Sequence, residues 1–381
     1  MSISASTAVS PGDRARVLAR FAGGWLLVVA AVVLTAMLLW RTGGGHGLTQ
    51  LTDFRIFRAA GEAVMRGASP YPPPTVDAMR GQSVFVYPAP AAALFTVLAV
   101  APFTVSWLIW LAGMCAAMLL ALRLAGVRDP RVMACWFLAP AMAQTFVIGS
   151  LAPLLALCAV LIWRYRDRVW VVASVLSLAI CLKLLLLPLV LWLVITKRLR
   201  AAVATVAITA AACVLGWALI DFRGFADYPH LLSSLSAIEQ SIGFSTTALG
   251  LALGLPPAAA QAMVAASAAG LCLLAWRRVA AGDELGAFCL LLVTGLVVSP
   301  IVWAHYLAIV AVAIAFYRPR LSPLWLMPLV FWAVPNMLPR GNLAWLLLWH
   351  AMLVLTLLPA AGVAVPALSA RLAARAQRQV A

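Results

Sequence analysis

Long apolar runs separated by short polar or basic segments make up most of the chain. The first run covers residues 22–40, close to the roughly 20 residues that a membrane-crossing helix needs. Further runs follow at 104–122, 132–147, 151–163, 169–182, 184–196, 201–220, 259–276, 285–299, 306–317, 322–335 and 343–359. Backbone groups in lipid must be hydrogen-bonded within their own segment, and runs that are long and non-alternating achieve this as helices rather than as barrel strands. The pattern predicts an all-α polytopic membrane protein.

The number and completeness of the helices follow from the lengths of the runs. Several runs are shorter than a full span, so we expect about 11–13 transmembrane helices, some of them tilted, broken or re-entrant. The stretch 88–103 contains Pro88, Pro90 and Pro102, which predict a short or re-entrant element rather than a complete helix. The run 22–40 is too long for a signal peptide and has no small-residue cleavage site, so we interpret it as a retained anchor.

Composition and charge support a membrane location and predict its sidedness. With 65% apolar residues, 10% charged residues and a mean hydropathy of +1.04, the chain has more apolar surface than a soluble core can hide. The net charge of +16 would favour nucleic acid in a soluble protein, but here basic clusters lie between the apolar runs, as in cytoplasmic loops. These clusters are Arg123, Arg128 and Arg131; Arg164, Arg166 and Arg168; Lys197, Arg198 and Arg200; Arg277 and Arg278; Arg318 and Arg320; and Arg371, Arg375 and Arg378.

Placing these clusters inside gives a domain plan with both termini in the cytoplasm. Residues 1–21 form an N-terminal tail, residues 22–359 the transmembrane domain, and residues 360–381 a basic C-terminal tail. The large outer loops are 41–87 and 221–257. In the first of them, apolar residues at helical spacing alternate with arginines and predict an amphipathic helix in the membrane interface, which ends at Gly67. Its apolar positions are Phe54, Phe57, Ala60, Ala63 and Val64.

Few side chains on the predicted outer side carry chemistry. The outer acids are Asp53, Glu62, Asp77, Asp221, Asp227 and Glu239. Asp53 lies at the start of the amphipathic helix, where it is either the N-cap of that helix or a base at the bilayer surface. Lys183 lies between two apolar runs, so it either extends harmlessly to the interface or faces a polar cavity suited to a phosphate. His305 follows Trp303 and is either an interfacial aromatic or part of a site.

The sequence contains no recognisable motif for a soluble cofactor or a metal. The seven cysteines all fall within apolar runs and lack the spacing of metal ligands or disulfides. No GxxxxGK loop, histidine-rich motif or GxSxG elbow occurs. We therefore expect no cofactor, although the sequence leaves the use of a divalent cation open.

Several segments together resemble glycosyltransferase family 87, of the GT-C superfamily. They are DFRIFRAAGEAVMRGASPYP from Asp53, FVYPAPAAALF from Phe85, the pair Lys183 and Pro188, and SPIVWAHY from Ser299. The resemblance covers about residues 26–358. Two positions depart from the family pattern: Gly149 is followed by Ser-Leu-Ala rather than Gln-x-Asn, and Ala304 stands where an acid is common. These departures concern the choice of acceptor.

The resemblance implies a GT-C-like catalytic domain that transfers a sugar, most simply mannose, from a polyprenyl-phosphate donor to a glycolipid or polysaccharide acceptor. It implies that the reaction takes place at the outer face of the cytoplasmic membrane, where the lipid bilayer delivers both substrates. By this resemblance Asp53 matches the family's general base, Lys183 matches its intramembrane lysine, and His305 matches the histidine after its Ser-Pro-x-x-Trp step. Tyr87 and Trp303 match motif positions and are candidate substrate contacts.

The chemistry of the outer residues agrees with an inverting transfer. Displacement at a phosphate-linked sugar needs one carboxylate to deprotonate the acceptor and cations to stabilise the departing phosphate. Lys183, His305, Arg55 and Arg58 are the candidate cations, and Asp53 has no obvious second carboxylate for a retaining mechanism. The alternative is a lipid-linked-oligosaccharide transporter or flippase, which would depend on Lys183 and tolerate Asp53→Asn.

Overall fold

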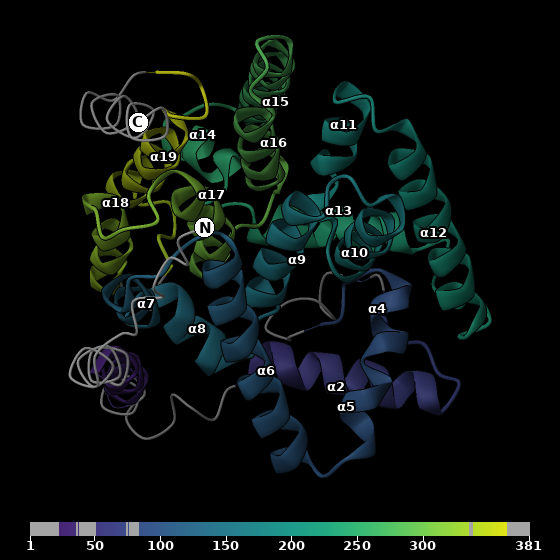
Figure 1. The fold of residues 1–381 in the computed structure, drawn as a ribbon. Helices are drawn as coiled ribbons and strands as arrows, with labels where there is room; N and C mark the ends of the chain where they lie inside the picture. Colours follow the sequence, from purple (N-terminus) through teal and green to yellow (C-terminus); the bar gives the residue numbers. More distant parts are fainter. Residues whose placement is uncertain are drawn as a thin grey trace, which may run out of the picture.

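The protein is described by a computed structural model that covers residues 23–35, 37, 51–73, 75, 84–334 and 338–363. Within these ranges all regular secondary structure is helical (Figure 1). The tails 1–21 and 364–381, the end of the anchor, the first part of the outer loop and Asp77 lie outside the described residues. The all-α prediction is therefore confirmed for the part of the chain that the structure describes.

Among the described residues, three helices are long and apolar enough to cross a membrane, or four spans if the bent pair Pro130–Phe137 and Pro140–Ile148 counts as one. The three long helices are α6 (Phe103–Leu124), α12 (Leu199–Ala218) and α15 (Pro257–Ala280). The remaining apolar helices are shorter: Gly23–Thr35, α9 (Ala152–Arg164), α10 (Val169–Leu182), α16 (Glu284–Val298), α17 (Leu307–Tyr317) and α19 (Leu343–Leu357). The chain is thus a helical membrane protein, while the number of about 11–13 crossings stays a prediction.

Prolines divide several of the predicted runs into two pieces. The run 132–147 forms α7 (Pro130–Phe137) and α8 (Pro140–Ile148), which meet at an angle of 54°. The break falls at Ala139, whose extended backbone is what a residue before proline prefers. In the same way 184–196 divides into η2 (Leu184–Leu186) and α11 (Pro188–Ile195), and 322–335 into α18 (Pro323–Leu326) and η4 (Met327–Ala333).

The proline-rich stretch 88–103 forms only short helices, as predicted. It contains α4 (Ala89–Leu94) and α5 (Thr96–Val100), and Ala101 is extended before Pro102, the N-cap of α6. Whether this stretch re-enters the membrane stays a prediction.

The predicted amphipathic helix is α2 (Thr52–Met65), and Gly67 follows it with a positive φ of 65°. Phe54 and Phe57 are fully buried, and Phe54 packs edge-on to Phe103 and Trp107 at 5.4 and 5.3 Å. In Figure 1, α2 lies across the same end of the molecule as α4 and α5. Its apolar face is covered by protein, so the face that was expected to meet lipid supports the fold instead.

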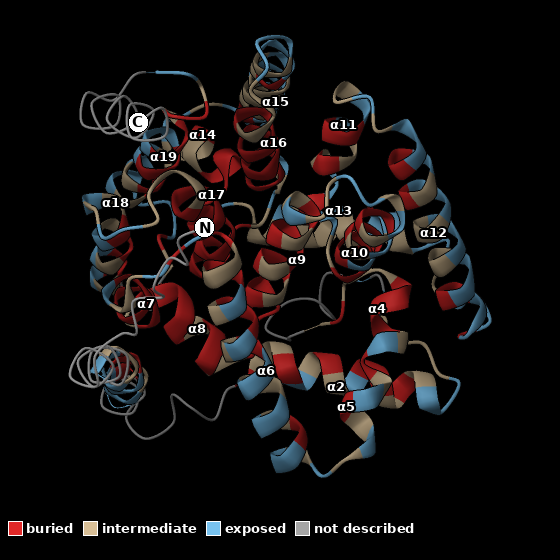
Figure 2. Cartoon of the chain, viewed as in Figure 1, coloured by how far each residue is buried: buried red, intermediate tan, exposed pale blue. Residues whose placement is uncertain are grey.

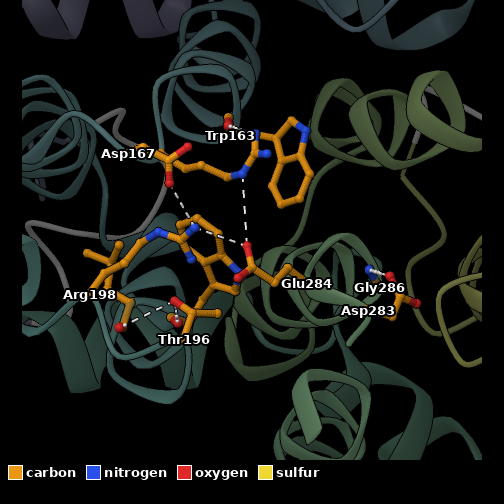
Figure 3. Close-up of polar contacts among 10 residues, drawn as sticks. Trp163, Asp167, Thr196, Arg198, Asp283, Glu284 and Gly286 are labelled. Atoms are coloured by element: carbon orange, nitrogen blue, oxygen red, sulfur yellow. Dashed lines mark hydrogen bonds and ion pairs between the residues drawn. The ribbon is translucent and has the colours of Figure 1, made fainter. Parts of the chain in front are cut away.

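The predicted cytoplasmic loops meet at one end of the molecule. The Arg198 guanidinium lies 3.0 Å from the Asp167 carboxylate and 3.1 Å from that of Glu284, and Arg166 lies 3.9 Å from Glu284 (Figure 3). These contacts join the loops after α9, after α11 and before α16.

The predicted outer segments meet at the other end. Leu51 N–H donates to the Val147 carbonyl at 2.9 Å, and Phe244 N–H donates to the Val302 carbonyl at 2.7 Å. The Trp110 indole donates to the Gly149 carbonyl at 2.9 Å. Helices α9, α10 and α16 run between the two ends, which supports the predicted division into two sides; which side faces the cytoplasm stays a prediction.

The interior and the perimeter differ in what their apolar side chains contact. Helices α16 and α17 are apolar on every side and almost wholly buried, as a central helix must be (Figure 2). By contrast, α15 buries only Ala260 and Ala275, and Val203, Val206 and Leu215 of α12 are exposed. Exposed apolar surface of this extent matches lipid rather than water. The remaining helices are α13 (Tyr228–Glu239), α14 (Thr246–Ala252) and η3 (Ala304–Tyr306).

Candidate active site

Lys183 lies at a break between two short helices. Pro188 has no N–H to bond the Leu184 carbonyl, which instead accepts from Leu187 N–H at 3.0 Å in a tighter turn. Lys183 itself is extended, with φ −165° and ψ 133°, so its side chain leaves the axis of α10. The ammonium donates to the Tyr306 hydroxyl and lies 5.1 Å from the centre of the Tyr87 ring. The predicted alternative of a lysine extending to the interface does not describe this enclosed position.

The segment 299–306 forms a second break beside the first. Pro300 ends α16 at Val298, and the chain runs extended through Trp303 before the turn η3. His305 is only 2% exposed, and its backbone N–H and Nδ1 lie 3.1 and 3.3 Å from the Gln144 Oε1. Because that oxygen only accepts, Nδ1 is the nitrogen that donates to it, and Nε2 has no partner among the described residues. His305 is therefore a fixed, buried group rather than an interfacial aromatic.

Asp53 approaches this pair of breaks from α2. The N-cap position of that helix is Leu51, and the Asp53 carboxylate makes no capping hydrogen bond, so Asp53 is not the N-cap. Burial raises the pKa of the Asp53 carboxyl to about 6, and the nearby positive charge of Lys183 opposes this rise. The carboxylate also acts on Tyr87, because burial and then the charge of Asp53 raise the pKa of that phenol. Asp53, Tyr87 and Lys183 therefore belong to one electrostatic group.

The segment that carries Tyr87 is held from two sides. The Tyr87 ring packs edge-on to Phe57 of α2, with 5.0 Å between the ring centres. The Tyr71 hydroxyl donates to the Tyr87 carbonyl at 2.9 Å, and the Tyr228 hydroxyl donates to the Val86 carbonyl at 3.1 Å. Pro88 then begins α4. The phenol is thus held close to the Lys183 ammonium and within the electrostatic influence of Asp53.

The two predicted arginines lie apart from this group. Arg58 donates to the carbonyls of Leu98 and Ala101 at 2.9 and 2.7 Å and pairs with Glu62 at 2.9 Å. Arg55 is exposed, and its guanidinium lies 4.8 Å from the centre of the Phe103 ring. Successive helical residues turn by about 100°, so a residue two positions after Asp53 faces nearly away from it. Arg58 thus binds the carbonyl end of α5.

Trp303 lies at the edge of the second break, half-buried, against the chain at Gly243. A Cβ added at Gly243 would lie 3.4 Å from the Trp303 ring and closer still to the Val302 carbonyl oxygen. The close approach of these two segments therefore depends on glycine.

Sequence reasoning did not single out Tyr306 and Gln144. Tyr306 is 2% exposed, accepts a hydrogen bond from Lys183 and stacks edge-on to His305 with 4.4 Å between the ring centres. Gln144 was visible as a lone amide inside the apolar run 132–147, and polar side chains within membrane segments commonly have a partner there. Tyr306 is the last residue of the motif SPIVWAHY, but nothing in the sequence distinguishes it from the other aromatic residues of the chain.

Asp53, Lys183 and Tyr306 have the chemistry that a group-transfer site needs. A carboxylate with a pKa of about 6 can accept a proton at neutral pH, and an ammonium beside a tyrosine hydroxyl can bind an anion. In the described part of the chain, no cluster of three or more histidine, cysteine, aspartate or glutamate side chains is placed to hold a metal ion.

Comparison with known proteins identifies a family and two similar proteins. The model of glycosyltransferase family 87 matches residues 85–303, more than half of the chain. A polyprenol-phosphate-mannose-dependent α-(1-2)-phosphatidylinositol pentamannoside mannosyltransferase of Mycolicibacterium smegmatis is 28% identical over 292 residues, which cover 72% of this chain. The protein of that name from Mycobacterium tuberculosis is 27% identical over 272 residues, which cover 66% of this chain. The chain spans 66% and 58% of the lengths of these relatives, and no solved structure matches it.

Proposed function

Since the chain belongs to glycosyltransferase family 87, we propose that it transfers a sugar, mannose, from a polyprenyl-phosphate donor to a glycolipid or polysaccharide acceptor. The reaction would take place at the outer face of the cytoplasmic membrane. The observation that supports this proposal is that the Asp53 carboxylate lies close enough to the Lys183 ammonium, which stands at a helix break, for each charge to act on the pKa of the other. The printed names of the two mannosyltransferase relatives support mannose as the sugar.

In this proposal Asp53 is the general base of an inverting displacement. Asp53 takes the proton from the acceptor hydroxyl as the acceptor oxygen attacks the anomeric carbon of the donor sugar. The bond from that carbon to the phosphate oxygen breaks, and its electron pair leaves with the polyprenyl phosphate. A carboxyl with a pKa of about 6 is ionised at pH 7 and is more basic than an ordinary aspartate, which favours proton transfer.

The departing phosphate is assigned to Lys183 and Tyr306. The ammonium stabilises the negative charge that develops on the leaving oxygen, and the Tyr306 hydroxyl adds a second donor once phosphate displaces it from Lys183. The hydrogen bonds from His305 to Gln144 fix the segment 299–306, and they leave Nε2 of His305 for contact with the phosphate. Arg55 and Arg58 fit a structural role better than the predicted contact with phosphate, because their guanidinium groups lie against Phe103 and the end of α5.

The decisive experiment replaces the proposed base. Purified protein in nanodiscs is given labelled polyprenyl-phosphate-mannose and a mannosylated lipid acceptor, and mannolipid product is counted. Asp53→Asn is expected to reduce transfer by about 10²- to 10⁴-fold, the contribution of a general base. The control is Asp221→Asn, the same change at an exposed carboxylate of the α12–α13 turn.

The Asp53→Asn variant is expected to remain folded. The raised pKa means that ionised Asp53 is less favourable in the folded protein than in the unfolded chain at any pH above its ordinary value of 3.8. Asparagine removes this unfavourable charge, so thermal unfolding at pH 7.5 is not expected to shift downwards. Full transfer by Asp53→Asn would refute the base assignment. Failure of the wild-type protein to form any glycosidic bond would leave the flippase alternative.

A further inference from the structure

A recess lies beside the segment that carries Tyr87 and has no part in the proposed chemistry. It has a volume of about 270 Å³ and is lined mainly by Ser69, Tyr71, Pro72, Pro73, Asp227 and Tyr228. This size is just below the roughly 300 Å³ at which drug-sized ligands begin to fit, so it suits a small ligand such as one or two sugar rings.

The walls of this recess are fixed to the active-site segment. The Tyr71 ring stacks on Trp217 with 5.0 Å between the ring centres, and Tyr228 packs against both rings. The hydroxyls of Tyr71 and Tyr228 bind the carbonyls of Tyr87 and Val86, so both point toward the segment that carries the Tyr87 phenol. A ligand in the recess therefore lies against the two tyrosines that hold the segment carrying Tyr87.

The position of the recess relative to the bilayer is set by the end of α12. Leu219, Phe222 and Phe225 are 56%, 48% and 54% exposed, directly after this membrane-spanning helix. The charged pair Asp221 and Arg223 occupies the same turn, with 3.1 Å between the groups. Exposed apolar rings beside exposed charges mark the level at which lipid gives way to water. Gly224 of this turn lines the recess, so the recess lies at the membrane surface.

The side chains that line the recess favour a sugar over a phosphate or a lipid tail. Asp227 is exposed and its carboxylate has no hydrogen-bond or ion-pair partner among the described residues, so it is a free acceptor of hydrogen bonds. Its negative charge disfavours a phosphate, and its polarity disfavours a lipid tail. A sugar ring has an apolar face for the tyrosine and proline surfaces and hydroxyl donors for the carboxylate.

We infer that this recess binds a sugar ring of the acceptor, remote from the hydroxyl that reacts at Asp53. The inference rests on the proposed glycosyl transfer and adds the residues that hold the acceptor. Because the recess lies at the membrane surface, the ring is that of a glycolipid head group or of a polysaccharide that reaches the membrane.

Kinetics with Asp227→Asn test the inference. Asparagine still accepts a hydrogen bond through Oδ1 but lacks the charge that strengthens it, so the acceptor KM is expected to rise about tenfold, with kcat and the donor KM unchanged. Asparagine is also a good N-cap, so α13, which starts after residue 227, keeps its start. Asp221→Asn is the matched control, because it removes the same charge from the same turn without lining the recess. An unchanged acceptor KM in Asp227→Asn, with Asp53→Asn inactive, overturns the acceptor site and leaves the function standing.

A binding measurement is independent of turnover. Because Trp217 stacks on Tyr71, a sugar in the recess is expected to change tryptophan fluorescence in a saturable way, and Trp217→Phe removes that change. The titration uses a soluble manno-oligosaccharide in one arm and a mannosylated lipid in nanodiscs in the other, which separates a polysaccharide from a glycolipid source. Asp227→Asn is expected to raise the ligand concentration at half-saturation about tenfold. Equal curves for Asp227→Asn and wild type, or no saturable change with either ligand, overturn the inference even if Asp53→Asn proves active.

Discussion

At the scale of single residues, the candidate site brings two opposite charges, Asp53 and Lys183, close together at the ends of helices. Asp53 makes no capping hydrogen bond in α2, and Lys183 has an extended backbone directly after the end of α10. Each charge is placed where regular backbone stops or starts, and each is surrounded by protein. The Asp53 carboxyl therefore has a raised pKa even though Lys183 lies close by, because the loss of water outweighs the attraction of the ammonium.

This balance predicts the dependence of transfer on pH. The carboxyl must be ionised to accept the proton of the acceptor, so kcat/KM for the acceptor is expected to be level above pH 6 and to fall about tenfold per pH unit below it. Rates of the purified protein from pH 4.5 to 8 at saturating donor measure this limb. An ordinary aspartate would place the limb near pH 4, and a limb there would contradict a buried base at position 53.

At the scale of helices, the sequence predicted the elements better than it predicted their partners. Long apolar runs predicted α6, α12 and α15, and the prolines of the stretch 88–103 predicted that it forms only short helices. The partners of Arg58 were not predictable, because the Leu98 and Ala101 carbonyls come from a helix end about forty residues away. The contact between His305 and Gln144 likewise joins two breaks that only the fold brings together.

The seating of α2 depends on one glycine. A Cβ on Gly61 would lie 2.6 Å from the Phe95 carbonyl carbon, at the junction of α4 and α5. Gly61→Ala is therefore expected to push α2 away from that junction, lowering the melting temperature by several degrees and reducing transfer along with it, since Asp53 is on the same helix. Thermal unfolding of the purified protein followed by circular dichroism measures the first effect. Gly113→Ala in α6 is the control, because no atom lies within 4 Å of its added Cβ and alanine favours the helix. Equal melting temperatures for the two variants would contradict the close contact.

At the scale of the whole molecule, the polar loops gather at two ends. The basic loops join through Arg198, Asp167 and Glu284 at one end (Figure 3), while the turn with Asp221 and the recess near Tyr71 lie at the end that carries α2. The pattern of arginine clusters was enough to predict this grouping, because it reflects how a membrane protein is inserted rather than how its helices pack. The same pattern predicts that the end with Asp53 faces away from the cytoplasm.

Labelling of matched cysteines tests that orientation. The side chains of Asp167 and Asp221 are 75% and 74% exposed, and each pairs with one arginine, so Asp167→Cys and Asp221→Cys present comparable thiols at the two ends. A membrane-impermeant maleimide applied to intact cells is expected to label Asp221→Cys at once and Asp167→Cys only after permeabilisation. The wild-type protein reports the reaction of the native cysteines, which lie in apolar segments. The reverse pattern would place Asp53 in the cytoplasm, and an outward-facing transfer site would then be excluded. Labelling of both positions from one side would instead contradict the separation of the two ends.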